Sequence, residues 1–182
     1  MKTLDNILEI CKKQKNFTYF NESENSHWVG DGFAFFLDTD EGEITPALLT
    51  AATKLSVSAL SDTEFKKKNY SLLFNLSDDD DNEIECSNAL FEININKQEY
   101  YIIYAFDGAH LLPKVYFKDI REPYTIFTRK QQKGNGIYFA IKNGMLLSAV
   151  MRDAWGDVLK MHAPGIFEFE QEVKKVAENE KG

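Results

Sequence analysis

The chain has 182 residues, of which 43% are hydrophobic and 13% aromatic. That is enough apolar surface to build the core of an ordinary domain, so a disordered chain is excluded. Twenty-nine acidic residues against 21 basic ones give a net charge of −8. This charge argues against general affinity for nucleic acids or anionic membranes, because both attract Lys and Arg.

Two helices and a small antiparallel meander are expected in the first 60 residues. Apolar residues three and four apart after Thr3 are typical of an amphipathic helix, and the basic run 12–15 suits its carboxyl end. Thr45 and Pro46 are typical of a second helix start. The expected elements are a helix from Thr3 to the basic run, strands at 17–20 and within 27–37 on both sides of Gly30-Asp31-Gly32, and a helix from Pro46 to about residue 55–60.

Hairpins and less regular segments follow. A capping box at 61–64 can lead into a short basic helix over 65–70. Pro113 opposes both a central strand and a continuous helix, so a helix that starts near this residue is expected. The other expected elements are a strand at 71–76, a charged loop at 77–85, a hairpin of 89–95 and 99–106, a strand at 124–128 and a docked helix at about 167–180.

The strongest local pattern spans Ile137 to Arg152. Asn143 and Gly144 tolerate positive φ, as a two-residue hairpin turn requires, and apolar residues fill both faces of the two arms. Such a hairpin belongs in the centre of a sheet that is covered on both sides. The expected fold class is therefore α+β, a mostly antiparallel sheet built from hairpins with two or three amphipathic helices packed on it.

We expect one compact domain, 1–182, or two subdomains, 1–70 and 71–182. The amino terminus lacks the apolar core of a signal peptide, and the sequence has no run of 18 apolar residues. Cys11 and Cys86 are then expected to be thiols in a reducing compartment. We therefore expect a cytoplasmic protein without a membrane partner. Aromatic strands that could pair between copies leave the oligomeric state open.

Two acidic clusters are the unusual feature of the sequence. Positions 78–85 hold six carboxylates and no basic residue. Neither cluster has the spacing of a calcium loop, which needs glycine at its sixth position and glutamate at its twelfth. A solvated, self-repelling loop is one interpretation. The other is a DNA-mimicking surface, since extended residues rise about 3.3 Å each, close to the phosphate spacing along a DNA strand. The candidate partner-binding residues are Asp78, Asp79, Asp80, Asp81, Glu83 and Glu85 in the first cluster, and Asp38, Asp40, Glu41 and Glu43 in the second.

Motifs that carry chemistry are missing from the sequence. It has no G-x-S-x-G nucleophile elbow, no phosphate-binding loop and no dinucleotide fingerprint, so no catalytic residue and no cofactor are assigned. His27, His110 and His162 lie far apart, without the spacing of a zinc site. His27 is expected on a strand, and His110 in a turn or cap. We expect no enzyme, and an active site assembled from scattered residues is the remaining alternative.

Two stretches of the sequence resemble known proteins. Residues 27–36 (H-W-V-G-D-G-F-A-F-F) and 138–150 (Y-F-A-I-K-N-G-M-L-L-S-A-V) resemble small proteins encoded by phages and prophages of gut Firmicutes. Within that group, the length and acidity resemble type II-A anti-CRISPR proteins, which inhibit the Cas9 nuclease. The resemblance implies a stoichiometric inhibitor in the cytoplasm of a bacterial host that binds Cas9, either free or loaded with guide RNA. Cas9 holds nucleic acids in positively charged channels, which suits an acidic partner.

The alternative is an accessory protein of phage DNA metabolism with a clamp-like shape. Asp31-Gly32 and Asp107-Gly108 each stand between apolar segments, as the turns of a clamp-like repeat do. Such a protein would contact DNA directly through the lysines at 66–68 and the basic loop at 129–133, and this binding would weaken steeply with salt. The sequence leaves open which state of Cas9 is bound, and whether DNA binding or cleavage is blocked.

Overall fold

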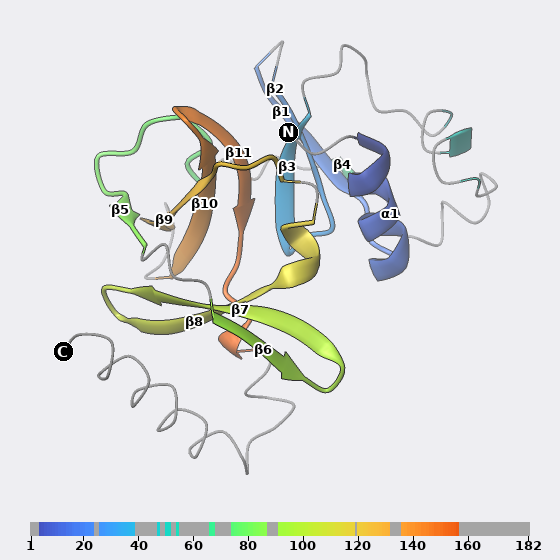
Figure 1. Ribbon diagram of the computed structural model, residues 1–182. Coiled ribbons are helices and arrows are strands. Elements are labelled where there is room, and N and C mark those ends of the chain that lie inside the picture. The colour runs from blue at the N-terminus through green and yellow to red at the C-terminus, as the bar shows by residue number, and fades with distance from the viewer. Residues whose placement is uncertain are drawn as a thin grey trace.

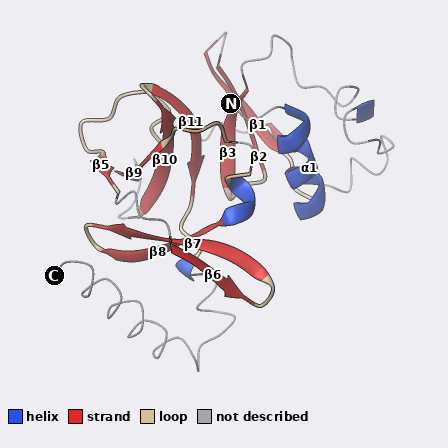
Figure 2. Ribbon diagram, in the orientation of Figure 1, coloured by secondary structure: helices blue, strands red, loops and turns tan. Residues whose placement is uncertain are grey.

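A computed structural model describes residues 4–23, 26–38, 47, 50–51, 54, 66–67, 74–86, 91–118, 120–131 and 136–156. These residues form an eight-stranded sheet, a three-stranded sheet and one α-helix (Figures 1 and 2). The expected α+β fold with mostly antiparallel sheet is confirmed. The prediction of two or three packed helices is wrong for the described residues, whose elements include one α-helix and one short 3-10 helix.

The large sheet combines strands from both sides of residue 70. Its strands are β1 (Thr18–Ser23), β2 (Ser26–Gly30), β3 (Ala34–Asp38), β4 (Lys66–Lys67), β5 (Ile84–Glu85), β9 (Thr125–Lys130), β10 (Ile137–Asn143) and β11 (Leu146–Met151). They lie in the order β4-β1-β2-β3-β11-β10-β9-β5. Only β1 and β4 are parallel among these pairs, so β3 and β11 join the two halves in antiparallel fashion.

The expected central hairpin is confirmed, with its turn one residue further along the chain. β10 and β11 lie inside the sheet, between β9 and β3. Asn143 pairs with Leu146, so the two turn residues are Gly144 and Met145. Gly144 has a φ of 62°, and glycine at the first turn position is typical of a type II′ turn. Asn143-Gly144 can form the two central residues of a type I′ turn, and Gly144 can also be the first central residue of a type II′ turn. The dipeptide is compatible with both, so it does not determine the register of the hairpin.

A β-bulge in the hairpin changes which core one residue enters. Pairing along β11 jumps from Ala149 to Leu147, so Ser148 is one extra residue on this strand. Strict alternation places Leu147 on the same face as Ala149. Instead, Leu147 packs with Val150 in the core on the opposite face.

Helix α1 (Leu4–Gln14) is the amphipathic helix expected after Thr3, and it lies beside β2 (Figure 1). Ile7, Leu8 and Cys11 on its apolar face are buried in the main core. The helix ends at Lys15, which has a φ of 53°. The amide of Asn16 donates to the carbonyl of Cys11, and that of Lys15 to the carbonyl of Lys12, the hydrogen bonds of a Schellman motif.

The small sheet contains the second expected hairpin. It consists of β6 (Phe91–Ile95), β7 (Gln98–Ala105) and β8 (Gly108–Pro113), all antiparallel. Asn96 and Lys97 form its first turn with φ values of 51° and 66°, as a type I′ turn requires. After β8 the chain forms only the 3-10 helix Lys114–Tyr116, where a longer helix was expected.

Both faces of the central hairpin are covered, as expected. The small sheet packs on one face, where Ile103 and Leu112 join Phe139 and the buried face of α1 in the main core. The other face carries a second core that contains Tyr138 and is covered by Phe74. The hairpin therefore lies between two hydrophobic clusters.

Buried Asp31 fixes the turn between β2 and β3. Its Oδ1 accepts hydrogen bonds from the amides of Phe33 and Ala34, at 2.9 and 3.1 Å. Its Oδ2 accepts a 2.7 Å hydrogen bond from the hydroxyl of Tyr116. One carboxylate thus joins the large sheet to the 3-10 helix that follows the small sheet.

Some expected elements are wrong or lie outside the described residues. The basic helix expected over 65–70 is wrong at Lys66–Lys67, which pair with β1 as a short edge strand. Lysines are common on such edges because they discourage pairing with other chains. The strand expected at 71–76 is wrong at 74–76, where the backbone is irregular. The helix expected at 167–180 lies wholly outside the described residues. The one from Pro46 lies outside them except at 47, 50–51 and 54, where residues 47 and 50–51 are helical and the amide of Lys54 donates to the carbonyl of Thr50 at 2.9 Å.

Candidate partner-binding surface

The acidic loop, residues 74–86, is anchored on the sheet at both ends. Phe74 packs edge-on against Tyr138, with ring centroids 5.0 Å apart. The hydroxyl of Tyr138 donates to the carbonyl of Asn75 at 3.0 Å and accepts from its amide at 2.9 Å. Burial raises the pKa of Tyr138 to about 12, so the hydroxyl keeps its proton at neutral pH. At the other end, the amide of Cys86 donates to a carbonyl of β9 at 2.8 Å.

Arg129 on β9 organises the loop, although it is only 1% exposed. Its Nη1 donates to the carbonyls of Asn75 and Ser77, at 3.1 and 2.8 Å, and its Nη2 to that of Asp78 at 2.9 Å. Its Nε and Nη2 also donate to Oε2 of Glu83, at 3.0 and 2.6 Å. One buried guanidinium therefore holds both arms of an otherwise acidic loop.

Lys142 on β10 completes this buried charge cluster. Its Nζ donates to Oε1 of Glu83 at 2.9 Å and lies 5.1 Å from the centre of the Phe127 ring. Lys142 is 5% exposed. Both carboxylate oxygens of Glu83 are thus paired with buried cations, so Glu83 acts within the fold and not toward a partner.

Two of the aspartates also have structural contacts. Oδ1 of Asp78 accepts a 2.7 Å hydrogen bond from the amide of Leu147, next to the bulge in β11. Asp80 accepts from the amide of Asn82 and from the side chain of Asn75, both at 2.8 Å. The chain forms a turn at residues 81–82, so it is not extended there. The loop therefore lacks the continuous extended backbone on which the DNA-mimicking interpretation based its regular carboxylate spacing, because it turns at 81–82.

Asp79, Asp81 and Glu85 remain at the surface. All three are exposed, and none forms a side-chain hydrogen bond or ion pair within the described part of the chain. Met145 at the tip of the central hairpin is 78% exposed, two residues from the amide that binds Asp78. Asp78 is exposed as well, although its Oδ1 binds the amide of Leu147. The loop thus presents three exposed carboxylates without internal hydrogen bonds, and beside them Asp78 and an apolar tip.

The first residue of the second acidic cluster, Asp38, is buried and is not available to a partner. Asp38 ends β3, opposite His27, and is only 3% exposed. Asp40, Glu41 and Glu43 lie outside the described residues.

Arg129 is also unavailable for the direct DNA contact expected of the loop at 129–133. It belongs to β9 and is buried against the acidic loop. The sequence does contain a signal for Lys142, which lies in the otherwise largely apolar strand β10, but not for Arg129, because β9 also holds two threonines and Lys130. A basic side chain in such a strand must find a buried anion, because an unpaired buried charge is too costly.

Both cysteines are free thiols, as expected, and both are buried. Burial raises the pKa of Cys11 well above its ordinary value and that of Cys86 to about 12. Neither thiol is ionised at neutral pH, so neither is a candidate nucleophile.

A second charge cluster joins the two sheets. His110 lies on β8 and is 8% exposed, so its expected place in a turn or cap is wrong. Its Nδ1 lies 3.0 Å from Oδ2 of Asp153, and its Nε2 lies 2.9 Å from Oδ1 of Asp107. Ionised carboxylates only accept hydrogen bonds, so this arrangement favours a ring that carries a proton on both nitrogens, the imidazolium form. The ring packs edge-on against Phe139 of the large sheet.

The stability of the fold should therefore fall as the pH rises through the pKa of His110. Burial by itself lowers that pKa, but the hydrogen bonds and charges of Asp153 and Asp107 outweigh burial and raise it above 6.5. This stabilisation is fully present below about pH 6.5, which is the pKa of histidine in the unfolded chain. It is lost as the pH rises through the higher pKa that His110 has in the folded protein.

Urea unfolding of the wild type and of His110→Gln, from about pH 5.5 to 8.5, measures this effect. The difference between their free energies of unfolding should shrink as the pH rises. A difference that stays constant across this range would contradict the assignment of an imidazolium.

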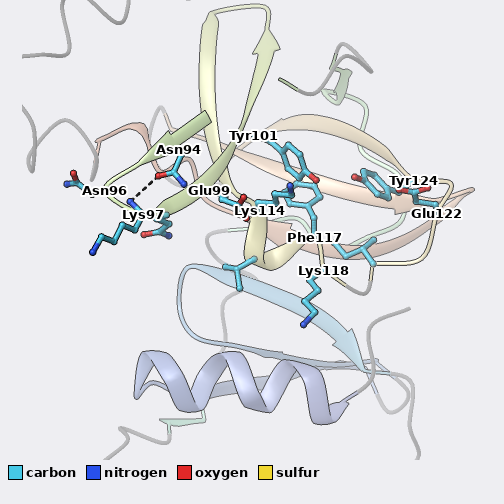
Figure 3. Close-up of a pocket in the computed structure, with 13 residues that line it drawn as sticks. Asn94, Asn96, Lys97, Glu99, Tyr101, Lys114, Phe117, Lys118, Glu122 and Tyr124 are labelled. Atoms are coloured by element: carbon cyan, nitrogen blue, oxygen red, sulfur yellow. Dashed lines mark hydrogen bonds between the residues drawn. The ribbon is translucent and has the colours of Figure 1, made fainter. Parts of the chain in front are cut away.

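A groove of about 850 Å³ lies beside the small sheet (Figure 3). Phe117 is packed between Tyr101 and Tyr124, with ring centroids 5.0 and 5.8 Å from theirs. Lys114 lies 5.7 Å from the centre of the Tyr101 ring and donates to Glu92 at 2.7 Å. The lining residues come from segments up to 30 positions apart, which is why no local pattern in the sequence reveals the groove.

No helix in the described ranges is long and apolar enough to cross a membrane. The same ranges contain no group of three or more His, Cys, Asp or Glu side chains that could hold a metal ion. The chain matches no family model, no curated protein and no solved structure, so its resemblance to anti-CRISPR proteins stays a prediction.

Proposed function

We propose that the chain is a binding protein without catalytic activity, which inhibits Cas9 by occupying a basic, DNA-binding surface of the nuclease. The observation that carries this proposal is the acidic loop. Arg129 and Lys142 neutralise its inner side, while Asp79, Asp81 and Glu85 remain exposed. The choice of Cas9 as partner rests on the resemblance described above and on the positive charge of its channels.

An anchored loop is suited to recognise a basic surface. Carboxylates held in place lose less conformational freedom on binding than those of a flexible loop, so more of the interaction appears as affinity. Arginines that hold phosphates bind carboxylates with the same two-pronged geometry. The net charge of −8 also speeds the encounter with a cationic cleft.

Replacing the three exposed carboxylates that form no hydrogen bond in the described structure should weaken Cas9 inhibition without unfolding the protein. The triple variant Asp79→Asn/Asp81→Asn/Glu85→Gln leaves the structural contacts of Asp78, Asp80 and Glu83 in place. Its affinity for Cas9 should fall about tenfold, mostly through a slower association, because these charges act at the rim of an interface.

Surface plasmon resonance at two salt concentrations measures that loss. The three replacements are also measured singly, and Glu9→Gln on α1 is their control, because it removes one exposed negative charge outside the loop, one that pairs with Lys12 at 3.5 Å. Wild-type association and inhibition by the triple variant would exclude the acidic loop as the contact surface.

The identity of the partner needs a separate experiment. The purified chain should capture Cas9, with or without guide RNA. In a gel-shift experiment without Cas9, it should not change the mobility of duplex DNA. A duplex shift that weakens steeply with salt, without Cas9 capture, would instead support the DNA-metabolism accessory protein.

A further inference from the structure

The groove beside the small sheet has aromatic walls suited to a flat cation. Phe117 is buried at its base, and Tyr101 stands at right angles to it, with an interplanar angle of 90°. Tyr124 leans against the other side of Phe117 at 44°. Lys114 already lies over Tyr101, so this ring accepts a cation within the molecule itself.

The polar groups around these rings are hydrogen-bond acceptors. Figure 3 shows Glu122 close to Tyr124 at one end of the groove. The Glu122 carboxylate and the hydroxyls of Tyr101 and Tyr124 form no hydrogen bond within the described residues. Burial is the main cause that raises the pKa of both tyrosines, and the charge of Glu122 raises each further. The hydroxyls are therefore neutral, and Glu122 is the charged group beside Tyr124 at this end of the groove.

The lysines of the groove do not favour an anion at the same place. Lys114 is already paired with Glu92. Figure 3 shows Lys97 at the end of the groove away from Tyr124 and Glu122, and Lys118 directed away from the tyrosine rings. The acceptors Glu122 and Tyr124 thus lie away from Lys97 and Lys118, and the charge of Lys114 beside Tyr101 is already matched by Glu92.

We propose that this end of the groove receives an arginine side chain of a partner protein. A guanidinium carries five N–H donors and no acceptor, so it can bind Glu122 and the two tyrosine hydroxyls at once while it stacks on an aromatic ring. This arginine site would be a second contact area, and its residues are distant in sequence from the acidic loop. It does not depend on which protein supplies the arginine.

An NMR titration of the full chain with the peptide acetyl-Gly-Arg-Gly-amide tests this site. The signals of Tyr101, Phe117 and Tyr124 should shift with a Kd of about 1 mM, a value suited to one side chain. The same peptide with citrulline, which has the shape of arginine without its charge, should produce no such shifts.

Two variants locate the contact. Glu122→Gln, at an exposed position, should weaken arginine binding about fivefold. Glu9→Gln should leave it unchanged. Equal shifts with the citrulline peptide, or arginine binding that Glu122→Gln does not affect, would overturn the proposal. Shifts caused by oligothymidylate at the same tyrosines would do so too, because they would show a site for a nucleic acid backbone.

Discussion

Replacing Arg129 by Met should lower the free energy of unfolding by about 3–5 kcal/mol, because it removes one partner of a buried ion pair. Glu83 would keep Lys142 as its only cation. The carbonyls of Asn75, Ser77 and Asp78 would lose their donor at the same time. Met fills a large part of the space of the arginine chain, so the loss would report mainly on these polar contacts and not on a cavity.

Urea unfolding of Arg129→Met and of two companion variants measures this effect. Lys130→Met changes the neighbouring exposed residue of β9 and should cost less than about 0.5 kcal/mol. Arg129→Lys keeps the charge but loses the planar fork, so its cost should be intermediate. A loss as small as that of Lys130→Met would show that the guanidinium does not hold the acidic loop.

Arg129→Met also separates the structure of the loop from its charge. The variant keeps Asp79, Asp81 and Glu85, yet their positions are no longer fixed by the guanidinium. Amides in the loop should exchange hydrogen faster than in the wild type, and binding of the basic partner should weaken. Unchanged exchange at Glu83, whose amide bonds to the carbonyl of Asp80, would contradict this coupling.

Replacing Asp31 by Ala should have the second largest effect, a loss of about 3–4 kcal/mol of unfolding free energy, because two buried donors and one partly buried donor lose a charged acceptor. These donors are the amides of Phe33 and Ala34 and the hydroxyl of Tyr116. Asp31 is 7% exposed and Tyr116 is 4% exposed, so water cannot easily replace the carboxylate. The change would loosen both the β2–β3 turn and the attachment of the 3-10 helix.

Thermal and urea unfolding of three variants separate these two roles. Tyr116→Phe removes only the hydroxyl and should cost about 1 kcal/mol. Asp31→Asn keeps an oxygen for the two amides and should be intermediate. If Asp31→Ala costs no more than Tyr116→Phe, the carboxylate does not support the turn.

Elements built from residues close in sequence could be predicted. Helix α1 follows from apolar residues three and four apart, and the hairpins of the small sheet and the centre follow from turn residues between apolar runs. The exact register of β11 could not be predicted. It depends on the extra residue Ser148, and the gain from placing Leu147 in the opposite core exists only when both faces of the sheet are packed.

The acidic run was visible in the sequence, but its arrangement was not. Arg129 lies 46 residues after Glu83, and Lys142 lies 59 residues after it. The groove and the imidazolium of His110 likewise combine distant segments, since Asp153 lies 43 residues after His110. Side chains so far apart leave no local periodicity, so composition and spacing could not indicate that they meet.

By itself, the sequence determined the α+β class, the first helix, the hairpins and the presence of a strongly acidic loop, because each depends on local propensity or on composition. Only the tertiary structure decided which carboxylates face outward. Two cations buried in β9 and β10 had to find an anion, and Glu83 supplies it, while Asp79, Asp81 and Glu85 face the solvent without a hydrogen bond and Asp78 is exposed but binds the amide of Leu147.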